Sequence, residues 1–267
     1  MVLREAGILS TDPLVRANLP PYDGGMTEAC FEKIAGKTPL LFLCDHAGNR
    51  LPSGYGTLGL KLVLFETHIA YDIGAAHVTR ALAADFAAPA VLGVFSRLLI
   101  DLNRGPDDPT LVMQLSDGSI IPGNRGIPAQ ELSRRIADFH VPYHQAIAAE
   151  IAGLGAPVLV SLHSFTPAWK GAKRKWEIGI LWDQDGRLAH PLMARLAEAG
   201  FTVGDNEPYT GALEGDTLNL HGTRAGLPHV LIEMRQDLVD NPDSARALAS
   251  RLKPILAAAL ADMKAAD

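Results

Sequence analysis

The sequence predicts an α/β protein with three layers, in which helices cover both faces of a largely parallel central sheet. Short apolar runs bounded by glycine and proline alternate with longer helical segments, which is the order expected of such a sheet. Several of these runs stop at polar or charged side chains, as strands do at the carboxyl edge of an open sheet. With 267 residues, of which 48% are hydrophobic, the chain can bury one sizeable core, so a single domain over residues 1–267 is expected.

The predicted strands are runs rich in leucine, isoleucine and valine. The most informative covers residues 157–162 and stops at His163. Its length and its glycine and proline borders favour a buried parallel strand. The other predicted strands cover residues 39–44, 90–95, 98–102, 177–182, 201–203 and 228–234. If the strand ends converge, they bring together His46, Asn103, Arg104, His163, Asp183, Glu233 and Arg235.

Helices are predicted between these strands, from their amphipathic pattern and from residues typical of helix ends. The segment 128–154 opens with proline, and residues 187–199 are followed by glycine, which suit the start and the end of a helix. The remaining predicted helices cover residues 27–35, 66–86 and 241–266. Among the loops, residues 105–126 and 204–226 are of a length that usually serves function.

Charge and composition exclude several classes of partner. The formal net charge is −6, so the chain has no overall positive field for nucleic acid or an anionic membrane. No apolar run approaches the ~20 residues of a membrane span. Residues 1–25 are expected to form an irregular, proline- and glycine-rich lead and not a signal peptide. Cys30 and Cys44 form no CxxC pair and are expected to be buried thiols, which favours a cytoplasmic protein.

Two histidines, His46 and His163, stand where apolar runs end, and together they indicate a metal site. Neutral imidazole is the commonest zinc ligand, although a histidine bonded to the backbone is the alternative for each. His68 and Asp72 are four residues apart at the start of a predicted helix, so they would share one helical face. Either residue could bind the metal as a third ligand, or could hydrogen-bond a residue that binds the metal. The alternative is a hydrogen bond between the two side chains that only stabilises the first turn of the helix. Asn49 suits a substrate carbonyl better than zinc.

Glu233 ends an otherwise apolar strand, where an unpaired carboxylate is costly to bury. It is therefore expected to be paired, to bind metal, or to act as a general base that takes a proton from water. A salt bridge to Arg235 is the structural alternative. Arg97 and His221, the latter in a glycine-containing loop, are candidates for stabilising the oxyanion of a transition state.

A carboxylate-binding pair is predicted at Asn103 and Arg104, which close the segment IDLNR. A guanidinium fork beside an amide suits a substrate carboxylate. The alternative is a structural arginine that braces the loop that follows. Arg125, Arg224 and Arg235 are further cationic residues that could bind a substrate carboxylate. Asn49 and Arg235 complete the set of predicted substrate-binding residues.

Five longer motifs stand out when they are taken together. They are DHAGNRLP at residues 45–52, HIAYDIGA at 68–75, FSRLLIDLNR at 95–104, SLHSFTP at 161–167 and GLPHVLIEMRQDL at 226–238. Together they resemble the N-formylglutamate amidohydrolase family, over about residues 38–240. This family is related to the zinc carboxypeptidases and aspartoacylases. The resemblance therefore implies a mixed, largely parallel sheet in a zinc-carboxypeptidase-like (phosphorylase/hydrolase-like) fold, with one zinc ion per chain or another divalent ion in its place.

The resemblance also implies roles for individual residues. The first zinc motif of the family is His-x-x-Glu, whereas this chain has Asn49 three residues after His46. Asp72 is expected to replace the missing ligand, and His163 matches the second zinc histidine. The other matches are Asn103 and Arg104 with the carboxylate clamp, and Glu233 with the catalytic glutamate.

The expected reaction is zinc-dependent hydrolysis of the amide bond of an N-acyl amino acid, with N-formyl-L-glutamate giving formate and L-glutamate. The expected partner is thus a small anionic substrate, with no nucleic acid and no membrane. Two alternatives stay open. One is a zinc amidase or peptidase that acts on another N-acyl amino acid or on a cell-wall peptide, although the long loops favour a covered pocket. The other is a metal-free protein that binds acidic metabolites.

Overall fold

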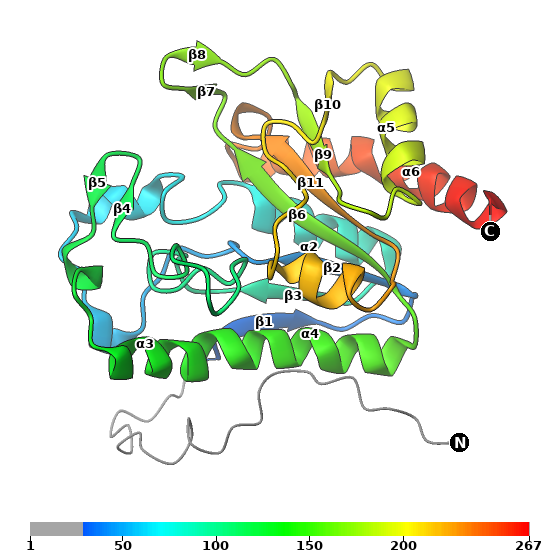
Figure 1. The fold of residues 1–267 in the computed structure, drawn as a ribbon. Helices are drawn as coiled ribbons and strands as arrows, with labels where there is room; N and C mark the ends of the chain where they lie inside the picture. Colours follow the sequence, from blue (N-terminus) through cyan, green and yellow to red (C-terminus); the bar gives the residue numbers. More distant parts are fainter. Residues whose placement is uncertain (1–28, 267) are drawn as a thin grey trace, which may run out of the picture.

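Seven strands form one sheet in the computed structural model, which describes residues 29–266 (Figure 1). In spatial order they are β1 (Phe31–Ile34), β3 (Ala90–Gly93), β2 (Leu40–Cys44), β6 (Val158–Phe165), β11 (His229–Arg235), β9 (Ile178–Leu181) and β10 (Val203–Asp205). Strands β3, β2, β6 and β11 run parallel to one another, whereas β1 is antiparallel to β3 and β9 is antiparallel to β11. The sheet is therefore mixed and largely parallel, as predicted.

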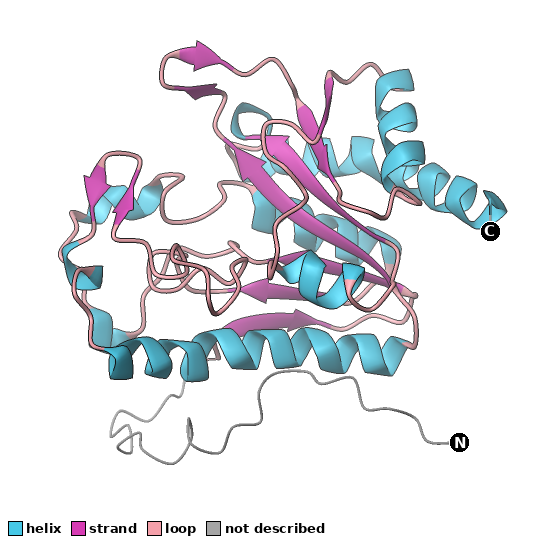
Figure 2. Ribbon diagram, in the orientation of Figure 1, coloured by secondary structure: helices cyan, strands magenta, loops and turns pink. Residues whose placement is uncertain are grey.

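Helices cover both faces of this sheet, which confirms the three predicted layers (Figure 2). They are α2 (Ala75–Phe86), α3 (Ala129–Arg135), α4 (Val141–Leu154), α5 (Ala189–Glu198) and α6 (Pro242–Ala266). On one face, α6 packs against α2 and α5, and these helices share a core with Phe42 of β2. On the other face, α4 shares a core with Leu41 and Leu43 of the same strand. Because successive strand residues point to opposite faces, β2 must be apolar on both, and it is buried throughout.

Short elements complete the described chain. Four 3₁₀ turns cover Ser53–Tyr55, Leu62–Glu66, Pro122–Asn124 and Gln236–Leu238. Two small hairpins, β4 (Leu115–Ser116) with β5 (Ser119–Ile120) and β7 (Ala168–Trp169) with β8 (Ala172–Lys173), project from the body of the fold (Figure 1). They arise in segments that the sequence predicted as irregular loops. No helix within residues 29–266 is both long enough and apolar enough to cross a membrane.

The helix predicted at residues 27–35 is wrong, because Phe31–Ile34 forms the edge strand β1. Glu32 and Lys33 favour a helix locally, but antiparallel pairing with β3 decides the conformation. Residues 27 and 28, and the irregular lead predicted for residues 1–25, lie outside the described residues.

The predicted helix that was to contain His68 and Asp72 begins only at Ala75. Gly74 precedes it with a φ of +79°, a left-handed conformation that glycine adopts at little cost. Ahead of that glycine, the amide of Asp72 donates a hydrogen bond to the carbonyl oxygen of His46 at 3.0 Å. The expectation that His68 and Asp72 share a helical face is therefore wrong.

The predicted strand at residues 98–102 is also wrong, since this segment forms turns. Its leucine and isoleucine side chains are buried nonetheless. The amide of Leu98 donates to the hydroxyl of Ser96 at 3.2 Å, and the amide of Arg104 donates to the carbonyl oxygen of Asp101 at 3.2 Å. The apolar run correctly predicted burial, whereas local hydrogen bonds set the backbone conformation.

Strand β6 runs three residues beyond its predicted end at residue 162, so His163 lies inside the strand. The extra residues pair with the parallel strand β11, which places His163 opposite Glu233. Side chains of residues in register point to the same face of a sheet. The longer strand therefore brings two of the predicted site residues side by side.

The remaining predicted elements are confirmed to within a few residues. The long helix at residues 128–154 consists of α3 and α4, joined without a break by a π turn at Ile136–His140. Pro142, which has no amide hydrogen, stands just after this turn. Strand β10 begins two residues later than predicted, because the amide of Phe201 hydrogen-bonds back to Leu196 at the end of α5. The other confirmed elements are the strands at residues 39–44, 90–95, 177–182 and 228–234 and the helices at 187–199 and 241–266.

Candidate active site

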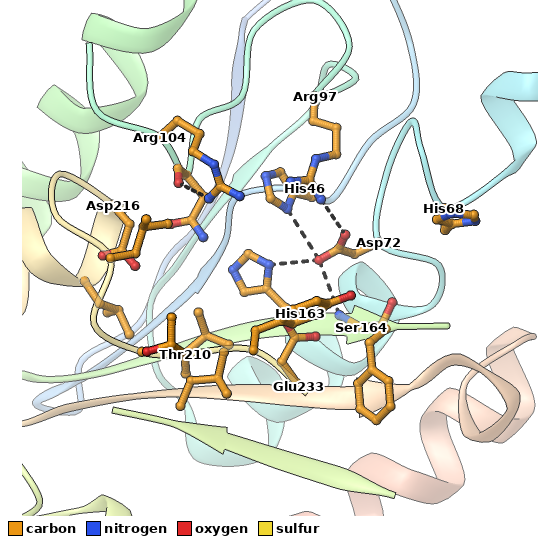
Figure 3. A pocket seen from close by; sticks show the side chains of 18 of the residues that line it. His46, His68, Asp72, Arg97, Arg104, His163, Ser164, Thr210, Asp216 and Glu233 are labelled. Carbon is orange, nitrogen blue, oxygen red and sulfur yellow. Dashed lines mark hydrogen bonds and ion pairs between the residues drawn. The ribbon is translucent and has the colours of Figure 1, made fainter. Parts of the chain in front are cut away.

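A cavity of about 580 Å³ opens where the parallel strands β2, β6 and β11 end. Ligand sites of open α/β sheets lie at this edge, since loops leave the strands there. The predicted site residues that line the cavity and are labelled in Figure 3 are His46, His68, Asp72, Arg97, Arg104, His163 and Glu233. Asn103 and Asp183 line it as well. The predicted convergence of the strand ends is thus found for most of these residues.

His46, Asp72 and His163 form a buried cluster with the donor set of a metal site. One ligand atom from each residue lies within 4.8 Å of those of the other two. His163 Nδ1 lies 2.8 Å from Asp72 Oδ2, and His46 Nδ1 lies 3.4 Å from the same oxygen. Two imidazole nitrogens and one carboxylate oxygen are typical protein ligands of a catalytic zinc ion.

In each of the two histidines, the other ring nitrogen, Nε2, is hydrogen-bonded to a carboxylate. His46 Nε2 donates to Asp101 Oδ1 at 2.6 Å, and His163 Nε2 donates to Asp45 Oδ2 at 3.0 Å. An ionised carboxylate only accepts hydrogen bonds, so these contacts leave Nδ1 of each ring directed at the centre of the cluster. Metal-binding histidines are usually oriented in this way, and the residues present therefore fit a divalent metal.

Asp45 is itself held in place by a set of buried donors. Its Oδ1 accepts hydrogen bonds from the Tyr143 hydroxyl at 2.9 Å and from the Thr217 hydroxyl at 2.7 Å. Burial opposes its charge, but hydrogen bonds from His163 and Thr217 and the nearby imidazoles keep the pKa of Asp45 well below its usual value. In turn, and against the effect of burial, Asp45 and Asp72 raise the pKa of His163 well above its usual value. A metal ion bound at Nδ1 would take the place of that proton.

The sequence analysis assigned no role to Asp45 or Asp101, and both orient metal-site histidines. A usable signal was present in each case. Asp45 directly follows a fully apolar strand, and Asp101 interrupts the buried run at residues 98–102. The argument that made Glu233 a candidate, that a buried carboxylate needs a partner, applies equally to these two residues.

Replacing Asp101 with asparagine is expected to weaken metal affinity by about 10- to 100-fold. The amide keeps the shape of the side chain but removes the charge that holds His46 and Arg97. A competition titration with a chromogenic chelator measures this affinity, and thermal unfolding checks that the variant folds. Asp107→Asn, at an exposed position, is the control. Equal affinity in a folded Asp101→Asn protein would contradict the orienting role.

Glu233 lies beside the metal-ligand cluster with an unused carboxylate oxygen. The residue is 6% exposed, and its Oε2 has no hydrogen-bond partner in the described structure. Burial raises the pKa of Glu233 to about 7, and the charge of Asp72 adds to the increase. The salt bridge between Glu233 and Arg235 that was the structural alternative is not present, since Arg235 pairs with Asp237 at 2.7 Å. A carboxylate with such a pKa can accept and return a proton near neutral pH.

Arg97 braces the cluster while it lines the cavity. Its Nη2 lies 2.6 Å from Asp101, and its Nη1 lies 3.5 Å from Asp72 Oδ1. The arginine thus balances carboxylates that hold or supply metal ligands. The oxyanion role predicted for Arg97 stays a prediction.

Asn103 and Arg104 also line the cavity, and both keep free donor groups. Arg104 Nη1 donates to the carbonyl oxygen of Asn103 at 2.8 Å, and Arg104 Nε lies 3.3 Å from the Thr110 hydroxyl. Asn103 Oδ1 accepts the amide of Thr217 at 3.1 Å, which leaves its NH₂ group for a ligand. In residues 29–266, Arg104 forms no ion pair with a carboxylate, although its charge helps to lower the pKa of Asp101 and opposes the rise that burial causes in the pKa of Asp216. A guanidinium group without an ion pair can still bind an anion.

Buried histidines hold the backbone on either side of Asn103. His144 Nε2 donates to the carbonyl oxygen of Leu102 at 3.0 Å, and His140 Nε2 donates to that of Arg104 at 2.9 Å. His221 Nε2 contacts His144 Nδ1 at 3.0 Å and lines a second cavity of about 830 Å³. His221 thus lines the second cavity and not the active-site cavity. The oxyanion role predicted for it stays a prediction.

Two other predicted substrate-binding residues do not line the active-site cavity. Asn49 donates to the carbonyl oxygen of Phe65 at 2.9 Å, which holds a surrounding loop. Arg235 contacts Asp237 and the carbonyl oxygen of Trp176. The structure thus gives neither residue a direct contact with a ligand in this cavity, because each is bonded to the surrounding fold.

His68 lines the cavity but stands apart from the metal-ligand cluster (Figure 3). Its Nε2 lies 3.3 Å from Asp117 Oδ2, and its ring meets that of Trp169 edge to face, with 6.5 Å between centroids. Asp117 and Trp169 belong to the two small hairpins, so His68 links both hairpins at the cavity. Asp72, and not His68, joins the two histidine ligands.

Asp216 is a further cavity residue that the sequence analysis did not single out. It is 5% exposed, and burial raises its pKa to about 6. Its Oδ1 accepts the amide of Asn219 at 2.7 Å. It lies in the long loop at residues 204–226, where sequence pattern alone does not distinguish a buried aspartate from an exposed one.

Comparison with known proteins places this site in a family. Residues 38–239 match the family described as FGase, N-formylglutamate amidohydrolase. A gene product from Agrobacterium tumefaciens of known crystal structure is 37% identical, with a TM-score of 0.84, over 89% of this chain and 97% of that chain. An N-formylglutamate amidohydrolase from Ralstonia eutropha JMP134 is 21% identical, with a TM-score of 0.66, over 86% of this chain and 96% of that chain. No curated protein matches the sequence.

The more distant structure from Ralstonia eutropha supports the shared fold alone. A metallo-carboxypeptidase from Pseudomonas aeruginosa also matches, over 87% of this chain and 61% of that chain, with 13% identity and a TM-score of 0.40, which is too remote to add to the argument. The family match itself spans most of the chain and contains every metal-ligand candidate and Glu233. The chain belongs to the N-formylglutamate amidohydrolase family.

Proposed function

We propose that this protein is a metal-dependent amidohydrolase that cleaves the amide bond of an N-acyl amino acid. The observation that carries the proposal is the buried Glu233 Oε2, which has no hydrogen-bond partner in the described structure and lies beside a His–Asp–His cluster that fits a metal. An unpaired buried carboxylate is costly, so its place here favours a catalytic role. Membership of the family supports an amide as the bond that is cleaved. N-formyl-L-glutamate, giving formate and L-glutamate, is the first candidate substrate.

His46, Asp72 and His163 would hold the metal, with zinc as the expected ion. A divalent metal bound there would polarise the amide carbonyl and lower the pKa of water in the cavity. Glu233 Oε2 would accept a proton from the attacking water and return it to the leaving nitrogen. Asp45 and Asp101 would keep the two imidazole rings in the orientation that presents Nδ1.

Arg104 and Asn103 would bind the α-carboxylate of the substrate. The α-carboxylate of an N-acyl amino acid is joined to the amide nitrogen through one carbon atom. Fixing the carboxylate therefore also fixes the amide relative to Glu233, which lines the same cavity. Two small hairpins, joined by His68, border this cavity, and they favour a small substrate over a cell-wall peptide.

The proposal is tested with zinc-loaded protein and a panel of N-formyl and N-acetyl amino acids with acidic, neutral and basic side chains. Chromatography of the released amino acid measures turnover. We expect hydrolysis of at least one compound, loss of activity after chelation, and recovery on adding zinc. Binding without turnover for every compound would instead support a protein that only binds acidic metabolites.

A further inference from the structure

Asp216 and Arg104 lie side by side at the active-site cavity. Both residues line it, and Figure 3 shows Asp216 beside Arg104. Asp216 is 5% exposed, and within residues 29–266 no direct ion pair joins it to the arginine. Arg104 is bonded to uncharged oxygens, those of the Asn103 carbonyl and the Thr110 hydroxyl. The two charged groups are thus neighbours, but neither is tied to the other.

The chain neighbours of this aspartate contact the chain neighbours of this arginine. The amide of Thr217 donates to Asn103 Oδ1 at 3.1 Å. On the other side, a Cβ atom at Gly215 would lie 3.0 Å from the Cα atom of Gly105, so the two glycines pack closely. Gly215 has a φ of +80°, which glycine adopts at little cost. The fold therefore fixes the aspartate next to the arginine.

Asp216 has one carboxylate oxygen that is free to take a proton. Its Oδ1 accepts the amide of Asn219 at 2.7 Å, whereas its Oδ2 accepts no hydrogen bond within the described residues. Burial raises the pKa of Asp216 to about 6, and the charge of Asp45 adds to the rise. The Asn219 hydrogen bond and the charges of His163 and Arg104 oppose it. The aspartate can therefore gain or lose a proton near neutral pH.

Other titratable groups on the surrounding segments do not change charge there. His140 and His144 hydrogen-bond the backbone of residues 102–104, and His221 contacts His144. Burial lowers the pKa of all three histidines, so they are neutral near pH 7. In the loop of the aspartate itself, Glu214 pairs with Arg224 at 3.8 Å. The charge of the arginine is thus opposed by one neighbour whose own charge is adjustable.

We propose that Asp216 competes with the substrate carboxylate for Arg104, so that binding of the substrate is coupled to uptake of a proton by Asp216. The inference rests on the proposed function, since it concerns the α-carboxylate of the N-acyl amino acid. While Asp216 is ionised, two carboxylates share one guanidinium and repel each other. A proton from the buffer that forms an O–H bond at Asp216 Oδ2 removes the repulsion. Asp216 thereby sets the affinity for the carboxylate.

The sign of the pH dependence follows from the two protonation states. Below a pH of about 6, Asp216 already carries its proton in the free protein, so the affinity is highest and nearly constant. Above that pH, the bound state keeps a proton that the free protein has lost. The affinity then falls by up to about tenfold for each unit of pH. The substrate carboxylate, with an ordinary pKa of about 3.5, stays ionised throughout.

Isothermal titration calorimetry on the zinc-loaded Glu233→Gln protein tests the proposal without turnover, and it removes Glu233 as a titrating group. The probe is N-formyl-L-norleucine, which has one carboxylate and an uncharged side chain. We expect it to bind about tenfold more weakly at about pH 8 than at about pH 6. Buffers of different ionisation enthalpy should reveal uptake of up to about one proton per ligand. Any binding of the matched carboxamide, N-formyl-L-norleucinamide, should occur without proton uptake.

Asp216→Asn, added to the same protein, locates the proton. Asparagine keeps the oxygen that accepts the Asn219 amide but cannot ionise. The probe should then bind equally well across this pH range, and at about pH 8 about tenfold more tightly than before the substitution. Asp183→Asn removes another carboxylate of the cavity lining and should leave the pH dependence unchanged. Thermal unfolding checks that both variants fold.

Weaker binding to the Asp216→Asn protein at every pH would overturn the proposal, because the aspartate would then support Arg104 and not compete with the ligand. A pH dependence that persists in this variant would also overturn it, as would no binding of the probe at any pH. If the probe binds as expected but the wild-type protein hydrolyses no compound of the panel, only the proposed function is refuted.

Discussion

Replacing Glu233 with glutamine is expected to lower kcat by about 10²- to 10⁴-fold, with the fold and the metal content retained. Glutamine has nearly the same shape as glutamate, but its amide cannot take a proton from water. Glu233 is not one of the three metal-ligand candidates, so the substitution removes proton transfer and leaves the donor set intact. Steady-state kinetics on the best substrate of the panel measure the effect. Because the lost interaction acts in the transition state, kcat and kcat/KM should fall together while KM changes little.

Two measurements make this result specific to Glu233. Elemental analysis should find the same metal content in the variant and in the parent. Glu214→Gln, at a side chain that is 91% exposed, should retain parental kinetics. Near-parental turnover by a metal-loaded Glu233→Gln enzyme would contradict the assignment of Glu233 as the base.

Replacing His163 with alanine is expected to reduce bound zinc from about one ion per chain to little or none. The substitution removes one of three ligand atoms, and it also leaves Asp45 and Asp72 facing each other without the imidazole between them. Uncompensated buried carboxylates commonly cost about 3–5 kcal/mol, so the free energy of unfolding should fall as well. Elemental analysis of protein purified without a histidine tag measures the metal, and chemical denaturation measures the stability.

His68→Ala is the matched control, because His68 lines the same cavity and pairs with Asp117 instead of the cluster. It should retain the parental zinc content. The metal assignment would fail if the parent took up no zinc on addition, or if His163→Ala, once shown to be folded, bound as much zinc as His68→Ala.

The sequence predicted the chemical identity of the site better than its conformation. His46, His163 and Glu233 were identifiable because polar side chains beside or within apolar runs are costly to bury without a purpose. Asp72 was selected by its place in a motif, whereas the helical face expected to present it does not exist. The structure reaches the same residue by another route, a backbone hydrogen bond from Asp72 to His46. The residue types of the site could therefore be predicted from the sequence, whereas the backbone conformation that presents Asp72 could not.

Register explains much of what the sequence could not predict. Whether Glu233 meets His163 depends on how β11 aligns with β6, and a shift of one residue would turn the glutamate to the opposite face. The contacts from Asp45 to His163, Tyr143 and Thr217 span 98 to 172 positions of sequence, so no local pattern contains them. Arg97 contacts Asp101 only four positions away in the sequence, but that contact depends on the turns that replace a predicted strand.

The sequence by itself determined the alternation of strands and helices, the edge of the sheet that carries the site, the family, and the main chemical groups. These follow from hydrophobic period and residue type, which are local properties. Only the tertiary structure decided which carboxylates orient the histidines, and which of the two lining arginines makes no ion pair with a carboxylate in residues 29–266. Those outcomes depend on distances between side chains far apart in the chain, and the electrostatic energy of a group is set by its neighbours in space.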